Sequence, residues 1–272
     1  MDANIELKRV KEWARMRGFA NLYRKESRAW WSTRRWWING VLWLGLLAGL
    51  VAMMMFFIPA LAAATGAPIP VGPAALGLKT FFEMGGLAIA IGVIIMCQDL
   101  IIEEKQTGLT EWLMAKPVQR KAYVLAKLCS SLVTVLLLLI ALPGAATYGL
   151  LSLQAGEPFS LQPFLAGMGI LVLHSLFYLT LTLMLGAFFS SRAPILGAAF
   201  GILFSNFLLQ PLFGILKPLL YVTPWLLPAD ATAVAGSWPV PPELLWSPLL
   251  ATALWCVVFT CAAIFKFERT EL

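Results

Sequence analysis

The sequence predicts an all-α integral membrane protein with six transmembrane helices, because the chain is poor in charge and rich in long apolar runs. Hydrophobic residues make up 60% of the 272 residues, and charged residues make up only 12%. A water-soluble domain usually carries about 25% charged residues, so lipid is the expected solvent. A helix needs about 20 apolar residues to cross the hydrocarbon core. Helices are the expected form, because each satisfies its own backbone hydrogen bonds in lipid.

The chain is predicted to be a single transmembrane domain, 1–272, because no linker or fixed-period repeat divides it. The third span carries Pro143-Gly144 and is expected to be broken there. A signal peptide has an apolar core of only about 7–15 residues, so the longer first span is expected to be retained. The expected spans are 37–63, 78–102, 122–153, 164–189, 194–216 and 249–265.

Residues 1–36 mix basic residues with aromatic ones, including Trp13, Tyr23, Trp30 and Trp31. A basic amphipathic helix of this kind lies in the membrane interface, although a solvated charged tail would also fit the composition. With six spans, 18 of the 20 Lys and Arg residues fall on the side of the termini. The excess of positive charge predicts that both termini are cytoplasmic. The net charge of +6 then meets anionic lipid headgroups, so no nucleic-acid partner is expected.

The outer segment 217–248 contains seven prolines and two apolar pieces that are too short to span. Short helices that dip back into the outer leaflet are one interpretation, provided that other protein satisfies their backbone. An aromatic-rich loop on the interface is the second interpretation.

The charged stretch between spans 2 and 3, residues 103–121, has its own pattern. Thr107-Gly108 is expected to break the helix and to cap a new one. Leu109, Trp112 and Leu113 then share one face of a short helix that ends before Pro117. The pattern predicts a short amphipathic helix at the cytoplasmic face, which fits a partner's groove or forms an interfacial turn anchored by Trp112.

This stretch resembles the first cytoplasmic loop of type-2 ABC transporter permeases. The resemblance rests on the acidic pair, the basic residue, the Thr-Gly pair, the sequence "LTEWLMAKPVQR" and the later Lys127. The usual order of the small pair in that family is Gly-Thr, so the order here is a departure. The six spans, the start "YRKESRAWW" and the charged tail "FKFERTEL" extend the resemblance to nearly the whole chain.

The resemblance implies the membrane subunit of a bacterial ABC exporter in the inner (plasma) membrane. Two permease subunits, as a homodimer or a related heterodimer, would pair above two copies of a separate ABC ATPase. The 103–121 stretch would be the coupling loop, and the N-terminal helix would be the elbow helix. The residues that the resemblance and the pattern assign to ATPase coupling are Glu103, Glu104, Lys105, Thr107, Gly108, Leu109, Glu111, Trp112, Leu113, Pro117 and Arg120.

The chain is not expected to be an enzyme. It contains no P-loop motif, so ATP and Mg would bind to the partner ATPase and no cofactor or metal to this chain. A membrane enzyme is disfavoured, since no HExxH or GxSxG motif occurs. Two rival functions remain open. One is a self-contained secondary transporter, which usually shows buried charges and inverted repeats. The second is a permease-like subunit that transmits force for assembly of another protein.

Two further sets of residues are candidates. Glycine pairs four residues apart allow close helix packing, either between subunits or within one. His174 lies in the middle of span 4, and an intramembrane ionisable residue is a functional candidate, although a neutral packed histidine is the simpler interpretation. The glycines are Gly45, Gly49, Gly197 and Gly201, and the possible translocation-path residues are His174, Asn206 and Gln210. Apolar spans suit a hydrophobic or amphipathic cargo.

Overall fold

The computed structural model describes residues 18–68, 71–108, 119–212 and 217–269. Every regular element in these ranges is helical, which confirms the predicted all-α class. Among the described residues, six helices are long and apolar enough to cross a membrane, which confirms the predicted number of spans. They are Arg35–Thr65, Pro73–Gln106, Arg120–Ala155, Leu161–Phe188, Arg192–Leu209 and Pro242–Arg269.

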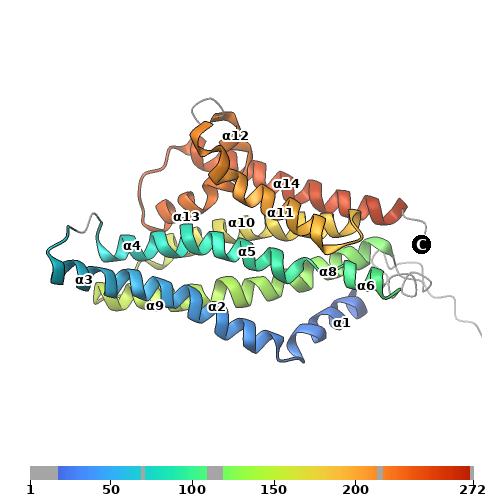
Figure 1. Ribbon diagram of the computed structural model, residues 1–272, viewed down its shortest axis with the longest axis horizontal. Coiled ribbons are helices and arrows are strands. Elements are labelled where there is room, and N and C mark those ends of the chain that lie inside the picture. The colour runs from blue at the N-terminus through green and yellow to red at the C-terminus, as the bar shows by residue number, and fades with distance from the viewer. Residues whose placement is uncertain (1–17, 69–70, 109–118, 213–216, 270–272) are drawn as a thin grey trace, which may run out of the picture.

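The first three spans are built from several helical pieces (Figure 1). Short π-helical turns at Met53–Phe57, Thr80–Met84 and Leu136–Ala141 join pieces within each span. The pieces are α2 (Arg35–Ala52) and α3 (Ile58–Thr65); α4 (Pro73–Lys79), α5 (Gly85–Cys97) and α6 (Ile102–Gln106); and α8 (Arg120–Val135) and α9 (Leu142–Ala155).

Pro143 does not break the third span, contrary to the expectation. A proline lacks the backbone N–H, and its ring collides with the carbonyl four residues earlier in a regular helix. The π turn Leu136–Ala141 comes directly before this point. A π turn shifts the hydrogen-bonding register, and the chain passes from α8 into α9 in helical form. In the fifth span, α11 ends at Leu209 and a 3-10 turn follows at Gln210–Leu212, whereas residues 213–216 of the expected 194–216 lie outside the described residues.

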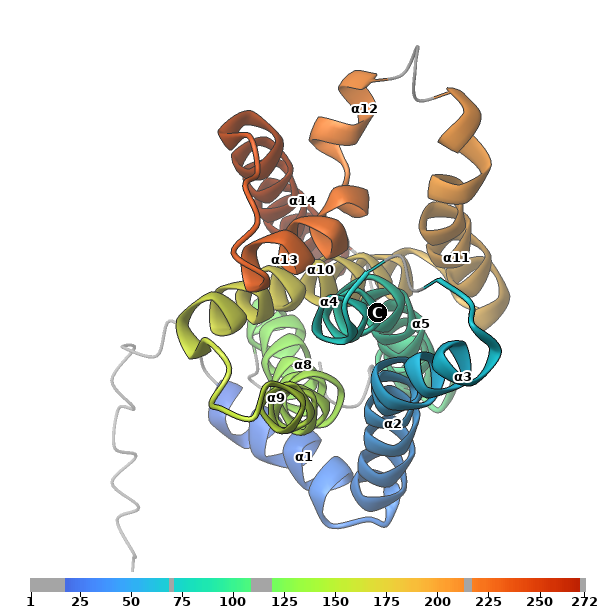
Figure 2. The ribbon, with the colours of Figure 1, turned by 90° about the vertical axis from the view of Figure 1, so that its left-hand side faces the viewer.

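The helix α10 (Leu161–Phe188) lies at the centre of the bundle, as the end view shows (Figure 2). It contacts α5, α8, α11 (Arg192–Leu209), α13 (Leu227–Ala235) and α14 (Pro242–Arg269). Its sequence is apolar on every side, which is typical of a helix surrounded by others. It is therefore the helix through which α5, α8, α11, α13 and α14 are packed together.

The outer segment folds back against the spans. The helices α12 (Lys217–Val222) and α13 follow one another, and α13 packs along α10. Gly167 of α10 makes this contact possible, because a Cβ atom there would lie 2.7 Å from the Ala231 carbonyl oxygen. The carbonyl oxygen of Pro224, just before α13, lies 3.3 Å from Nδ1 of His174, halfway along α10. The segment thus reaches the middle of a spanning helix.

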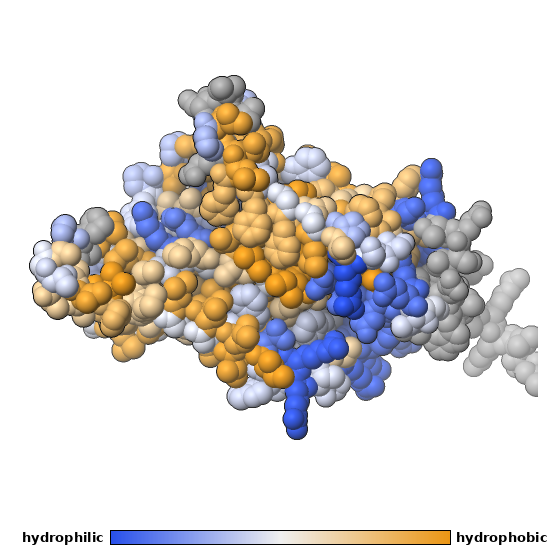
Figure 3. Space-filling model, viewed as in Figure 1, coloured by the Kyte–Doolittle hydropathy of each residue, from blue (hydrophilic) through white to orange (hydrophobic). Residues whose placement is uncertain are grey.

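The polar residues gather at one end of the molecule. Figure 3 shows apolar surface over most of its length and hydrophilic surface toward the end that holds α1 (Phe19–Trp31), α6 and the C-terminus. There α1 packs against α8, with Leu22 buried beside Tyr123 and Val124. This polar end carries the described coupling candidates, Glu103, Glu104, Lys105, Thr107, Gly108 and Arg120.

Candidate functional site

The helix α6 carries the acidic pair and the lysine at the start of the 103–121 stretch. It follows α5 after a turn at residues 98–101. Thr107 ends the helix and its hydroxyl donates a hydrogen bond to the Glu103 carbonyl oxygen at 2.9 Å. Gly108 has a φ of 68°, the left-handed conformation that favours glycine after a helix end. The Thr-Gly pair therefore ends α6 at a defined point.

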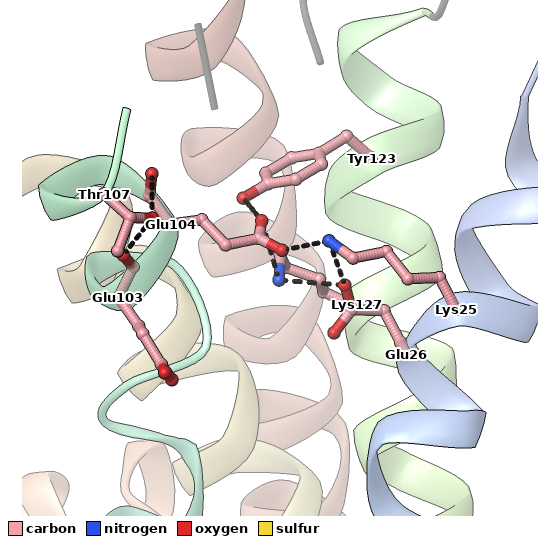
Figure 4. Close-up of polar contacts among 7 residues, drawn as sticks. All are labelled: Lys25, Glu26, Glu103, Glu104, Thr107, Tyr123 and Lys127. Carbon is pink, nitrogen blue, oxygen red and sulfur yellow. Dashed lines mark hydrogen bonds and ion pairs between the residues drawn. The ribbon is translucent and has the colours of Figure 1, made fainter. Parts of the chain in front are cut away.

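Glu104 is the hub of a buried polar cluster (Figure 4). Its carboxylate accepts a hydrogen bond from the Tyr123 hydroxyl at 2.5 Å and forms ion pairs with Lys25 and Lys127. Lys127 Nζ lies 3.1 Å from Glu104 Oε2 and also 3.1 Å from Glu26 Oε1. We call these five residues the Glu104 cluster. It joins α6 to α8, which carries Tyr123 and Lys127, and to α1, which carries Lys25 and Glu26.

The buried members hold the Glu104 cluster together more strongly than the exposed one. The Lys127 side chain is 3% exposed, whereas that of Lys25 is 42% exposed. A solvent-exposed ion pair contributes at most about 1 kcal/mol, but removing one partner of a buried pair costs about 3–5 kcal/mol. The ion pair between Glu104 and Lys127 is therefore the main contact that holds α6 against α8.

Lys105 fastens α6 to the central helix. Its ammonium group donates hydrogen bonds to the carbonyl oxygens of Gly186 at 2.9 Å, Ala187 at 2.8 Å and Phe189 at 3.3 Å. These carbonyls belong to the C-terminal end of α10, where the helix leaves them without internal partners. A cation at this end also interacts favourably with the helix dipole. Consecutive residues of α6 thus hold different helices.

The two ends of the 103–121 stretch are anchored to further helices. Before it, Asp99 forms an ion pair with Arg192 at the start of α11, with atoms 2.6 Å apart. At the C-terminal end of the stretch, Arg120 donates hydrogen bonds to the carbonyl oxygens of Phe267 at 3.1 Å and Glu268 at 2.7 Å, at the end of α14. A displacement of this stretch would therefore act on α8, α10, α11 and α14 together.

Several predicted coupling residues lie outside the described residues. They are Leu109, Glu111, Trp112, Leu113 and Pro117. Of the described candidates, Glu104, Lys105, Thr107 and Arg120 take part in the contacts above, and Gly108 provides the left-handed turn at the end of α6. The Glu103 side chain points away from the Glu104 cluster (Figure 4).

Sequence reasoning did not assign Lys25, Glu26 or Tyr123 to the site. A signal for Tyr123 was present: it precedes Lys127 by four residues and so shares its helix face. A lysine inside an apolar span also needs an acidic partner. Lys25 and Glu26 gave no comparable signal, because they sit among other charged residues in the N-terminal helix.

The four candidate glycines lie away from the packing of the described subunit. A Cβ atom at Gly45, Gly49, Gly197 or Gly201 would meet no atom within 4 Å. Gly92, by comparison, is in close contact with the Trp43 ring, where α2 packs on α5. The described contacts within one subunit therefore give the four glycines no role.

His174 and Asn206 line one pocket of about 620 Å³ between α5, α10, α11 and the outer segment. Glu83, Tyr178, Phe207 and Trp225 also line it. Gln210 lies in the 3-10 turn after α11, and its side chain is outside the described structure.

No curated protein sequence matches the chain. A family match nevertheless covers nearly the whole length, including the Glu104 cluster, the pocket and all six spans, and it confirms the resemblance stated from the sequence. Residues 20–272 match the ABC-2 family transporter proteins, and the chain belongs to that family as a multi-pass membrane permease.

Proposed function

We propose that this chain is the membrane half of an ATP-driven exporter, in which a separate ATPase drives the spans through residues 103–121. Membership of the family implies association with an ABC ATPase. The ATPase would bind ATP and Mg, and this chain would supply the path through the membrane.

The observation that carries the proposal is the way α6 is fastened. Glu104 ties it to α1 and α8, and Lys105 ties it to the end of α10. Because α6 is held by buried contacts, a displacement of the loop would also displace the helices that α6 contacts. Packed helices move as rigid bodies. When the ATPase closes on ATP, the displacement would reach α10 at the centre of the bundle and change the opening of the path.

The assembly would contain two permease subunits, identical or related, and two ATPase subunits. The outward-facing glycines of α2 and α11 support a close helix contact between permeases. Both termini would be cytoplasmic, because the basic residues gather on their side. Residues 217–248 would be re-entrant, since Pro224 contacts His174 in the middle of α10. A hydrophobic or amphipathic cargo suits the apolar spans.

A photo-crosslinking amino acid at position 112 tests the coupling role. In native membranes, we expect it to capture an ABC ATPase, identified by mass spectrometry, because Trp112 lies on the apolar face of the predicted helix. The same crosslinker at Leu161 is the matched control, since Leu161 is 53% exposed but starts α10 at the opposite end from Phe188. Capture of lipid alone from position 112, with nucleotide present, would contradict the proposal.

A further inference from the structure

The pocket between α5, α10, α11 and the outer segment has an unusual combination of polar and apolar walls. Its volume of about 620 Å³ is within the range of small-molecule sites. Leu203, Phe207, Leu220 and Leu226 provide apolar wall, and Trp225 provides an aromatic one. Met84 and Phe207 are 50% and 54% exposed, so the pocket opens toward the lipid-facing side of the subunit. A molecule could enter it from the bilayer.

Glu83 brings a negative charge to this pocket. It lies on the second span and lines the pocket, but it belongs to none of the ion pairs formed between described residues. Lys79 lies four residues earlier and forms no such pair with it. A charged side chain within a span is costly unless it is paired or hydrated. The carboxylate therefore favours a cation as its partner.

Two buried side chains in the pocket also have unused polar atoms. His174 and Tyr178 are 3% and 0% exposed, and neither His174 Nε2 nor the Tyr178 hydroxyl has a hydrogen-bond partner among the described residues. The Gly86 carbonyl lies near the imidazole ring, but it forms no hydrogen bond of normal geometry with Nε2. Buried polar groups are nearly always paired, so each unpaired one in a pocket requires an explanation.

In the tautomer that donates from Nδ1 to the Pro224 carbonyl oxygen, the free atom of His174, Nε2, is an acceptor. Nδ1 lies 3.3 Å from the Pro224 carbonyl oxygen, which can only accept, so in this contact Nδ1 carries the hydrogen. In the neutral ring Nε2 is then an acceptor. Glu83 adds two acceptor oxygens, and Asn206 adds an amide oxygen. An ammonium group donates hydrogen bonds and accepts none, so it matches this set, and the Trp225 ring can attract it as well.

We propose that this pocket binds an amine-bearing amphiphile, with the ammonium group at Glu83 and His174 and the apolar chain along Phe207 and Leu226. The proposal rests on the proposed transport function, for which it names the class of cargo. An anionic amphiphile would be repelled by Glu83, and a neutral one would leave that charge unpaired. An aminophospholipid and a free alkylamine share this chemistry.

Binding can be measured on the full chain without its ATPase, purified in dodecyl maltoside, which carries no charge. The probe is radiolabelled decylamine in a scintillation proximity assay. We expect saturable binding that decanol and decanoate do not displace. Glu83→Gln should weaken it about tenfold, the effect of losing one charge-assisted contact worth about 1.4 kcal/mol. Glu243→Gln should leave it unchanged, because Glu243 is also exposed but does not line the pocket.

Competition and a second variant separate the possible sources of the ligand. Displacement by phosphatidylethanolamine but not by phosphatidylglycerol identifies a bilayer lipid, and displacement by neither identifies a free amphiphile. Equal displacement by decanol and decylamine, or unchanged binding in Glu83→Gln, would overturn the proposal. His174→Phe, which keeps a planar ring without the acceptor, is the second variant and should weaken binding; it should also lower the melting temperature slightly, because the Nδ1 contact with Pro224 is lost. Since no ATPase is present, a failure here leaves the coupling role intact, and failed ATPase capture at position 112 leaves this result intact.

Discussion

Lys127 Nζ lies 3.1 Å from Glu104 Oε2, in a contact between α8 and α6 that is almost closed to solvent. Each residue has a second partner of opposite charge, Glu26 for Lys127 and Lys25 for Glu104. Positive and negative side chains alternate, so each charged residue lies beside an opposite charge. Such pairing is the condition for keeping ionised groups in an apolar bundle. The buried ion pair between α6 and α8 is therefore the stronger contact, and the exposed ion pair between α6 and α1 is the weaker one.

Glu104→Gln should destabilise the chain, whereas Glu103→Gln should not. The first substitution leaves Lys127 paired with Glu26, so we expect a loss of about 1–3 kcal/mol, less than the roughly 3–5 kcal/mol of a buried charge left with no partner. Glu103 is exposed and points away from the Glu104 cluster, so its change should stay within about 0.5 kcal/mol. Thermal unfolding of the purified variants, followed by tryptophan fluorescence, measures both. Equal shifts in melting temperature would contradict the assignment of Glu104 as the hub.

The two lysines of the Glu104 cluster should differ in the same way. Lys127→Met and Lys25→Met remove the same charge and keep similar volume, but only Lys127 is buried. Lys127→Met is expected to lower the melting temperature clearly, because Glu104 and Glu26 lose their buried counter-charge. Lys25→Met should cost less than about 1 kcal/mol, because its side chain is largely in water. A larger effect at Lys25 would show that the contact with α1, and not the contact with α8, holds α6 in place.

The spans were predictable because an apolar run of about 20 residues is a property of the sequence alone. The ends of the spans were less predictable. The last helix begins at Pro242, before the expected 249, because a helix can extend beyond the apolar run that predicts the span. The π turn before Pro143 was not predictable by pattern, because its residues, Leu136–Ala141, are apolar like the rest of the span.

The candidate site was predictable only in part. The Thr-Gly pair and the acidic pair are local signals, and they pointed to α6. The partners of Glu104 are not local, because Lys25 is 79 positions away in the sequence. Glu103 and Glu104 are also equivalent as a sequence pair, and only the rotation of about 100° between neighbours on a helix decides which one faces α8.

Lys105→Met should loosen α6 from the end of α10. The substitution leaves three carbonyl oxygens without the ammonium donor and removes a favourable charge from the helix end. Amide hydrogen exchange over residues 102–106 should then rise about tenfold, which corresponds to about 1.4 kcal/mol of local stability. Lys121→Met is the control, because Lys121 is exposed one residue after the start of α8. Unchanged amide hydrogen exchange in Lys105→Met would show that the contacts to α10 do not stabilise α6.

Gly197→Leu and Gly167→Leu should separate packing between subunits from packing within one. A side chain at Gly167 collides with Ala231 and Ala235 of α13, so this variant should unfold at lower temperature or fail to insert. A side chain at Gly197 meets nothing within 4 Å in the described subunit, so the monomer should keep its melting temperature. If α11 forms the close contact between permeases, the added volume forces the helices apart, and native mass spectrometry should show fewer dimers. A variant Gly197→Leu with full dimer content would remove α11 from that interface and leave α2, with Gly45 and Gly49, as the remaining candidate.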